Sequence, residues 1–187
     1  LKKRFFTKKQ SHDNVVIVTI YSSSINNIVL AEGKDAYYYR GAFADAVRAV
    51  DFVSTLEKAD AGHIFAQGES QGGALTLVAA SLDHRIKAIA PSAPFLSDFQ
   101  DYFRLAAWPG DPIIKAAREK GISDDELYKT LSYFDVMNFT DRIACPVIMA
   151  IGLQDPVCPP HTNFAGYNNI KTEKSWVCYP LSGHNVW

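Results

Sequence analysis

The sequence predicts an α/β fold built on a mostly parallel β-sheet, and three observations lead to this prediction. Short runs rich in β-branched residues alternate with longer segments in which apolar residues recur at helical spacing. The run from Val15 to Tyr21 is apolar almost throughout, which is typical of a strand buried on both faces. With 187 residues, 48% of them hydrophobic and 21% charged, the chain can form one globular domain with a sizeable core.

The predicted elements follow one another in a regular order. Residues 1–14 carry a basic cluster and are interpreted as a solvated segment that leads into the first strand. Strands are predicted at residues 15–21, 63–67, 86–90, 146–152 and 176–179. Helices are predicted at residues 39–56, at 71–80 and between 155 and 184. Because crossovers between parallel strands are right-handed, we expect these helices to cover both faces of the sheet.

Residues 95–138 interrupt this alternation. The stretch is aromatic, and Ser123 and Glu126 have the spacing of a capping box at the start of a helix. We therefore predict a helical insertion between two strands of the sheet. Such an insertion either lies over the active edge of the sheet or has a plain packing role, and both interpretations stay open.

Composition argues against several classes of function. Nineteen basic residues against 20 acidic ones give a net charge of −1, which provides no electrostatic footprint for nucleic acid. No apolar run approaches the roughly 20 residues that a membrane helix needs. Cys145, Cys158 and Cys178 form no CxxC pair, so neither a disulfide framework nor a zinc site is expected. The cellular compartment stays open.

The segment Gly68-Glu-Ser-Gln-Gly72 matches the G-x-S-x-G pattern of a nucleophile elbow. It follows a predicted strand and begins a predicted helix, as this elbow requires. The glycines two residues either side of Ser70 leave room for a strained turn, in which we expect Ser70 to have a positive φ. The alternative interpretation is an ordinary tight turn with an exposed serine.

A seryl hydroxyl needs a base, and the base needs a carboxylate that orients it. On the α/β-hydrolase fold these residues follow the serine in the order acid, then histidine. Asp155 comes just after the predicted strand 146–152, and His184 comes just after the predicted strand 176–179. The carboxyl ends of parallel strands meet at one edge of the sheet, where sites form. We therefore predict a triad of Ser70, Asp155 and His184, with His184 within hydrogen-bond reach of both partners.

Other titratable residues fit this order less well. His161 closely follows Asp155 and is a candidate rim residue. The other histidines are interpreted as surface or capping residues; they are His12, His63 and His84. The acids of the insertion do not follow a predicted strand; they are Asp98, Asp101, Asp111 and Asp135. Among these, Asp135 is the competing candidate for the acid that holds the imidazole.

Further motifs resemble those of a known enzyme family. They are Tyr37-Tyr-Tyr-Arg-Gly41, Asp45-Ala-Val-Arg-Ala49, Leu131-Ser-Tyr-Phe-Asp135, Gly152-Leu-Gln-Asp-Pro-Val-Cys-Pro-Pro160 and Leu181-Ser-Gly-His184, together with the elbow. In combination they resemble the carbohydrate esterase family that contains acetyl xylan esterases and cephalosporin C deacetylases. The resemblance extends from about Ala31 to the end of the chain.

The resemblance implies a serine esterase that hydrolyses acetyl esters of xylo-oligosaccharides, acetylated sugars or similar small alcohols through an acyl-enzyme. Ser70, Asp155 and His184 would be its triad, and the backbone N–H of Gln71 would donate to the oxyanion. The acetyl site would be lined by Pro94, Phe95 and Val157. The resemblance also implies that no metal or organic cofactor is needed, and that the chain forms a homo-oligomer.

Two alternatives stay open at this point. Another serine hydrolase of the same fold, such as a peptidase or a general carboxylesterase, would carry the same triad, because fold and triad do not fix the substrate. The other alternative is an inactive chain that acts as an oligomer component or binds carbohydrate. The lack of an upstream loop with a second oxyanion donor favours it, and the intact triad opposes it. Since the chain starts at Leu1 and ends three residues after His184, we expect a domain truncated at both ends.

Overall fold

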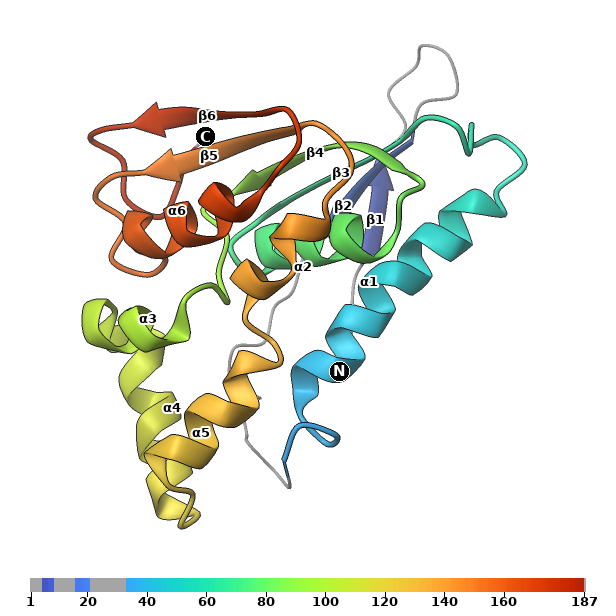
Figure 1. Cartoon of the computed structure of the whole chain (residues 1–187). Coiled ribbons are helices and arrows are strands. Elements are labelled where there is room, and N and C mark those ends of the chain that lie inside the picture. The colour runs from blue at the N-terminus through green and yellow to red at the C-terminus, as the bar shows by residue number, and fades with distance from the viewer. Residues whose placement is uncertain (1–4, 9–15, 21–32, 187) are drawn as a thin grey trace.

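The computed structural model describes residues 5–8, 16–20 and 33–186, and in them six strands form one sheet (Figure 1). The strands are β1 (Phe5–Lys8), β2 (Val16–Ile20), β3 (Ile64–Glu69), β4 (Ile86–Ser92), β5 (Val147–Gly152) and β6 (Lys174–Tyr179). They lie side by side in the order in which they occur along the chain. Only the β1–β2 pair is antiparallel. The predicted α/β fold with a mostly parallel sheet is therefore confirmed.

Helices fill the connections between the parallel strands. They are α1 (Tyr38–Ser54), α2 (Gln71–Leu82), α3 (Phe99–Leu105), α4 (Ala107–Glu119), α5 (Asp124–Ser132) and α6 (Pro160–Asn169), with two short 3-10 turns, η2 (Val136–Asn138) and η3 (Thr140–Arg142). The helices α1, α2 and α6 pack against the sheet, and α3, α4 and α5 extend away below it (Figure 1). No helix in the described part of the chain is long and apolar enough to span a membrane.

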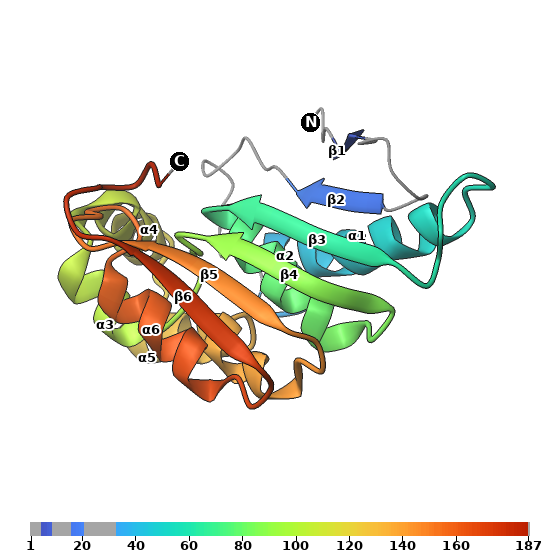
Figure 2. The same cartoon turned by 90° about the horizontal axis from the view of Figure 1, so that it is seen from above.

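The helices of the described residues lie on one side of the sheet, as the two views show (Figures 1 and 2). The expectation of helices on both faces is therefore wrong for this part of the chain. The physical reason is the strand order, which runs in sequence from β2 to β6. Each right-handed crossover then steps in the same direction and leaves its helix on the same face. The other face keeps apolar side chains partly exposed, such as Ile148 at 48% and Val177 at 39%.

The predicted strands agree with the observed ones to within about two residues at each end, which is the usual spread of strand and helix boundaries. One element differs in kind. Residues 5–8, interpreted as part of a solvated segment, form β1 and pair with β2. Phenylalanine and threonine favour strands, but three such residues between Arg4 and Lys8 carry too little pattern to be recognised. The predicted helix 39–56 corresponds to α1, and 71–80 corresponds to α2.

The buried helix α2 holds the centre of the core. Its residues from Gln71 to Ser81 are all buried, and most of them are small or apolar. A helix that is apolar all round is typical of a position covered on every side. The helix α1 instead presents one apolar stripe to α2 and β2, formed by Tyr39, Ala42, Phe43, Ala46, Val50 and Val53.

The predicted helical insertion is also confirmed, as α3, α4 and α5 with the two 3-10 turns. Its capping box has the expected geometry. The Ser123 hydroxyl accepts from the backbone N–H of Glu126 at 3.3 Å, and the Glu126 carboxylate accepts from the N–H of Ser123 at 3.1 Å. These bonds satisfy donors that a helix leaves free in its first turn.

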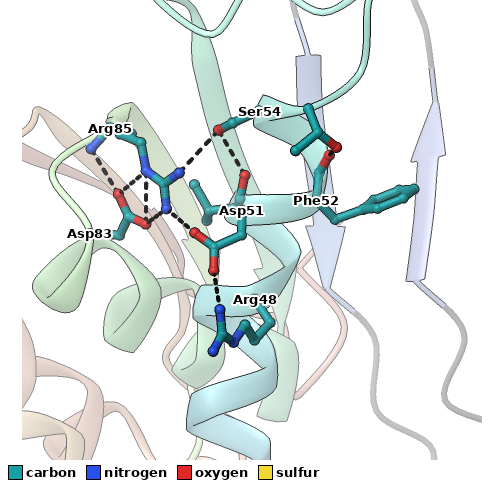
Figure 3. Close-up of polar contacts among 8 residues, drawn as sticks. Arg48, Asp51, Phe52, Ser54, Asp83 and Arg85 are labelled. Carbon is teal, nitrogen blue, oxygen red and sulfur yellow. Dashed lines mark hydrogen bonds and ion pairs between the residues drawn. The ribbon is translucent and has the colours of Figure 1, made fainter.

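An ion-pair network fastens the end of α1 to the turn between α2 and β4 (Figure 3). Arg85 lies between two carboxylates, with Nη2 2.5 Å from Asp51 Oδ1 and Nε 2.9 Å from Asp83 Oδ1. Arg48 donates a further bond of 3.0 Å to Asp51. Hydrogen bonds from Arg85 lower the pKa of both carboxyls. The network therefore joins helix and sheet at the amino ends of the strands.

We expect Arg85→Gln to destabilise the folded chain at neutral pH, because the mostly buried Asp83 carboxylate loses its charged partner. Arg85 is partly exposed, so the loss should be about 1 kcal/mol, or roughly 2–4 °C in Tm. A lowered folded-state pKa contributes stability above the unfolded value of about 3.9, and this stability is lost as the pH falls. The Tm values of the wild-type chain and of Arg85→Gln should therefore converge below about pH 4.

Thermal unfolding followed by circular dichroism at neutral and acidic pH measures this difference. Arg118→Gln is the matched control, since it removes an exposed ion pair with Asp124 and should leave Tm nearly unchanged. A Tm difference for Arg85→Gln that stays the same at both pH values would contradict the assignment.

Candidate active site

Ser70 lies in the turn between β3 and α2, with φ 55° and ψ −118°. The positive φ expected for an elbow serine is confirmed, and it is uncommon for a residue other than glycine. The turn is held against the end of β4, where the Ser70 N–H donates to Ser92 O at 2.9 Å and the N–H of Phe95 donates to Ser70 O at 3.0 Å. Such a backbone conformation costs of the order of 1–3 kcal/mol, and these bonds help to offset it.

Glycines allow the strand and the helix to meet at this turn. A Cβ atom at Gly68 would lie 2.4 Å from the carbonyl oxygen of Gly72. A Cβ atom at Gly73 would lie 2.8 Å from the carbonyl oxygen of Ser92. Both distances are shorter than any ordinary contact, so these positions exclude a side chain. Gly68 therefore has the steric role that the pattern predicts, and Gly73, just after the pattern, lets the helix approach the sheet.

Asp155 and His184 meet just beyond the carboxyl ends of β5 and β6. The distance from His184 Nδ1 to Asp155 Oδ2 is 2.8 Å. The other carboxylate oxygen of Asp155 accepts the N–H groups of Val157 at 2.8 Å and of Cys158 at 2.9 Å. The hydrogen bond with Asp155 raises the pKa of His184, and burial opposes this shift. A buried, fully oriented carboxylate thus fixes a half-buried imidazole.

The segment that carries His184 passes very close to the end of β5. A Cβ atom at Gly152 would lie 2.2 Å from the carbonyl oxygen of Gly183, so only glycine fits there. The N–H of Gln154 donates to Ser182 O at 3.0 Å. Val186 is 1% exposed and anchors the segment beyond the histidine. The imidazole is therefore held by its backbone on both sides as well as by Asp155.

Ser70 does not hydrogen-bond His184 in the geometry of the described residues, so this half of the expectation is not met. Its Oγ lies instead 3.9 Å from the sulfur of Cys158. One ligand-type atom each from Asp155, Cys158 and His184 lies within 4.8 Å of the others. Cys158 therefore lies close to all three predicted residues. In unliganded sites the bond between nucleophile and base is often long and tightens only with substrate.

Gln71 begins α2, where the first backbone N–H groups have no acceptor within the helix. Its side chain is buried, and Nε2 donates to Tyr39 Oη at 2.5 Å. Tyr39 lies in the first turn of α1 and is fully buried. The residue that follows Ser70 and begins α2 is therefore held by a tyrosine of the preceding helix. Sequence reasoning noticed the Tyr37-Tyr-Tyr motif but assigned Tyr39 no contact.

The three residues expected to line the acetyl site lie close to this centre. Phe95 bonds Ser70 through its N–H and is 3% exposed. The carbonyl of Pro94 accepts the Asn163 side chain at 2.9 Å, which joins it to α6. The carbonyl of Val157 accepts the hydroxyl of Tyr102 at 2.9 Å, which joins it to α3. The structure thus brings Pro94, Phe95 and Val157 to the site, and whether they contact substrate stays a prediction.

Asp135, the competing candidate for the acid that holds the imidazole, has another role in the structure. Its buried carboxylate accepts N–H bonds from Asp98 at 2.9 Å, Phe99 at 3.0 Å and Met137 at 3.1 Å. Burial raises the pKa of Asp135, and these bonds oppose the shift. Residues 93–98 include three further positive φ values, at Ala93, Leu96 and Asp98. Asp135 therefore holds this strained loop and not the imidazole, which bonds Asp155.

The other candidates lie away from this centre or outside the described residues. His161 bonds Asp101 at 2.9 Å and lies 3.4 Å from Asp98, so it links α6 to α3. His63 bonds Asp60 at 2.6 Å just before β3 begins. Asp111 lies in α4 and His84 in the turn before β4. His12 is outside the described residues.

The sequence pattern of the acetyl xylan esterase (AXE1) family matches residues 10–187. The chain belongs to this family. The resemblance that the motifs carried is therefore confirmed. A curated relative, acetyl esterase Axe7A of Xylanibacter ruminicola, is 37% identical over 155 residues. That match covers 82% of this chain and 34% of Axe7A.

Solved acetyl xylan esterases also superpose on the chain. The enzyme from Paenibacillus sp. R4 gives a TM-score of 0.80 at 38% identity, covering 88% of this chain and 54% of that one. Acetyl xylan esterase 1 from Thermoanaerobacterium sp. JW/SL YS485 gives a TM-score of 0.79 at 32% identity, covering 88% of this chain and 55% of that one. The chain thus spans about a third to a half of the length of these relatives. An acylaminoacyl peptidase with a TM-score of 0.64 at 20% identity shares the α/β-hydrolase fold alone.

We expect Gly152→Ala to destabilise this member of the acetyl xylan esterase family, because the new methyl group would collide with the backbone of Gly183. Overpacking of this kind costs about 1–3 kcal/mol, or at least roughly 2–4 °C in Tm. Gly41→Ala is the matched control. Gly41 lies in α1 with open space around it, so alanine there should stabilise by up to about 1 kcal/mol. Thermal unfolding that ranks the two variants equally would show that the His184 segment is not closely packed.

Proposed function

We propose that the protein is a serine esterase that hydrolyses acetyl esters of xylo-oligosaccharides, acetylated sugars or similar small alcohols. The observation that carries the proposal is the Asp155–His184 pair at 2.8 Å together with a serine whose φ is positive in the strand-to-helix elbow. Membership of the acetyl xylan esterase family supports the acetyl ester as substrate. The same features favour hydrolysis over a purely structural role, because an inactive chain has no need of an oriented imidazole.

In the proposed mechanism, Ser70 Oγ attacks the acetyl carbonyl while its proton passes to Nε2 of His184. The tetrahedral intermediate collapses, and the same proton passes from His184 to the oxygen of the departing alcohol. Water then attacks the acetyl-serine by the same route and releases acetate. Asp155 keeps the imidazole in the tautomer with the proton on Nδ1 and stabilises the imidazolium, without itself becoming protonated. No step requires a metal or an organic cofactor.

Charge develops on the carbonyl oxygen during each attack, and a preorganised donor is needed there. The N–H of Gln71 is suitable, because it lies at the first residue of α2, where the helix dipole also favours negative charge. Its side-chain bond to Tyr39 fixes the residue in place. We therefore assign one oxyanion donor to Gln71.

The acetyl group is small, and the proposed site suits a small acyl group. Phe95 and Cys158 are buried next to the turn of Ser70, and Val157 is partly buried on the acid side. We infer that apolar groups so close to the nucleophile limit the room for a long acyl chain. They support an acetyl ester over a long-chain ester or a peptide.

We expect Ser70→Ala, Asp155→Asn and His184→Ala each to lower the turnover of 4-nitrophenyl acetate and of acetylated xylo-oligosaccharides. Removal of triad members costs roughly 10⁴–10⁶-fold in another serine hydrolase, and double variants should lose little more because the residues act as a unit. His63→Ala is the control, since this exposed histidine pairs with Asp60 at the other end of β3. Additive losses in the double variants would contradict a triad.

Substrate choice separates the proposal from its alternatives. Acetate release from acetylated sugars should exceed hydrolysis of long-chain esters and of peptides at equal concentration. A preference for peptides or long acyl chains would favour another serine hydrolase of this fold. Loss of all hydrolysis in a chain whose circular dichroism shows that it is folded would favour the inactive, carbohydrate-binding alternative.

A further inference from the structure

Cys158 is a nucleophilic side chain at the centre of the site that the proposed mechanism does not use. It is fully buried, and its sulfur lies 3.9 Å from the hydroxyl oxygen of Ser70. Its backbone N–H donates to Asp155 at 2.9 Å, so the residue is fixed by the same carboxylate that orients His184. The thiol therefore faces the nucleophile from a rigid position.

Three different kinds of metal ligand converge at this point. A carboxylate oxygen of Asp155, the sulfur of Cys158 and a ring nitrogen of His184 all lie within 4.8 Å of one another. In a tetrahedral zinc site, bond lengths of about 2.0–2.3 Å place ligand atoms roughly 3.3–3.8 Å apart. For all three atoms to reach coordinating distance, the hydrogen-bonded pair of His184 Nδ1 and Asp155 Oδ2, now 2.8 Å apart, would have to open slightly while the sulfur of Cys158 moves closer. The hydroxyl of Ser70 lies beside the sulfur and can complete a fourth position.

We propose that Asp155, Cys158 and His184 form a binding site for a thiophilic divalent cation, Zn²⁺ or Cd²⁺. Sulfur, nitrogen and carboxylate oxygen together suit these ions better than Mg²⁺ or Ca²⁺, which prefer oxygen ligands alone. On binding, the thiol releases its proton to solvent, and its sulfur donates an electron pair to the metal. No electron is transferred between residues, and no bond other than the S–H bond is broken in Cys158.

The consequence for catalysis rests on the proposed function, whereas the binding does not. A metal on Nε2 of His184 occupies the lone pair that accepts the proton of Ser70. A metal on Nδ1 requires that nitrogen's proton to move to Nε2, which breaks the bond to Asp155. Either arrangement stops the triad. The cation is therefore expected to act as a reversible inhibitor that competes with substrate.

A second cluster, formed by Asp98, Asp101 and His161, provides an internal comparison. It is partly exposed and contains no sulfur. Its groups already pair with one another across α3 and α6. A spectroscopic signal from a metal–thiolate bond therefore reports the Cys158 site and not this one.

Titration with CdCl₂ or CoCl₂, followed by the charge-transfer absorption of a metal–thiolate bond, tests the binding. We expect wild type, Cys145→Ser, Cys178→Ser and His161→Ala to develop the band with one equivalent of metal. Cys158→Ser should lose the band. His184→Ala and Asp155→Asn keep the cysteine, and their affinity should fall at least about tenfold. Circular dichroism establishes that each variant is folded.

A band that persists in Cys158→Ser, or no band in wild type, would overturn the proposal. Unchanged affinity in folded His184→Ala and Asp155→Asn would also overturn it, and this holds even if Cys158→Ser fails to fold. Inhibition by ZnCl₂, relieved by EDTA and by excess substrate, tests the catalytic consequence separately. Failure of all ester hydrolysis would contradict the proposed function, while the absorption titration would still decide the metal site.

Discussion

The site depends on one constraint, which is the positive φ of the Ser70 backbone. A strand can turn into a helix within a single residue only if the two elements approach each other more closely than side chains normally allow. Gly68 and Gly73 provide this approach, and the small, buried residues of α2 continue it along the helix. The positive φ is kept by hydrogen bonds to the end of β4, so the nucleophile is positioned by the sheet and not by its own loop.

The rest of the site follows from where parallel strands end. The carboxyl ends of β3, β5 and β6 lie at one edge, and each is followed directly by a functional segment. Asp155 needs no distant partner for its orientation, because its own turn supplies two N–H donors. His184 then needs only a close passage over Gly152 to reach that carboxylate. The ion-pair network around Arg85 lies at the opposite ends of the strands and stabilises the fold without touching this chemistry.

Local patterns were sufficient for strands β2 to β6, the elbow and the meeting of Asp155 with His184, because each depends on spacing along the chain or on a general rule of parallel sheets. The side of the sheet that the helices cover was not predictable, since it depends on strand order, which no local pattern encodes. Asp135 acts on backbone groups 36 and 37 residues earlier, and such a contact leaves no signature in the sequence. The proposed metal site at Cys158 was not predicted for a similar reason. Metal sites are recognised in a sequence by the spacing of cysteines, whereas the partners of Cys158 are an aspartate and a histidine.

The bonds from Tyr102 to Val157 and from Asn163 to Pro94 cross-link the two sides of the site. One joins the inserted helices to the acid loop, and the other joins α6 to the loop behind the nucleophile. These segments are far apart in sequence, yet neither loop can move away without breaking a bond to an element anchored beside the other. The two bonds therefore couple the position of the acid loop to that of the loop behind the nucleophile. A displacement of either loop is thus expected to carry the other with it, so that the groups around Ser70 and Asp155 keep their relative positions.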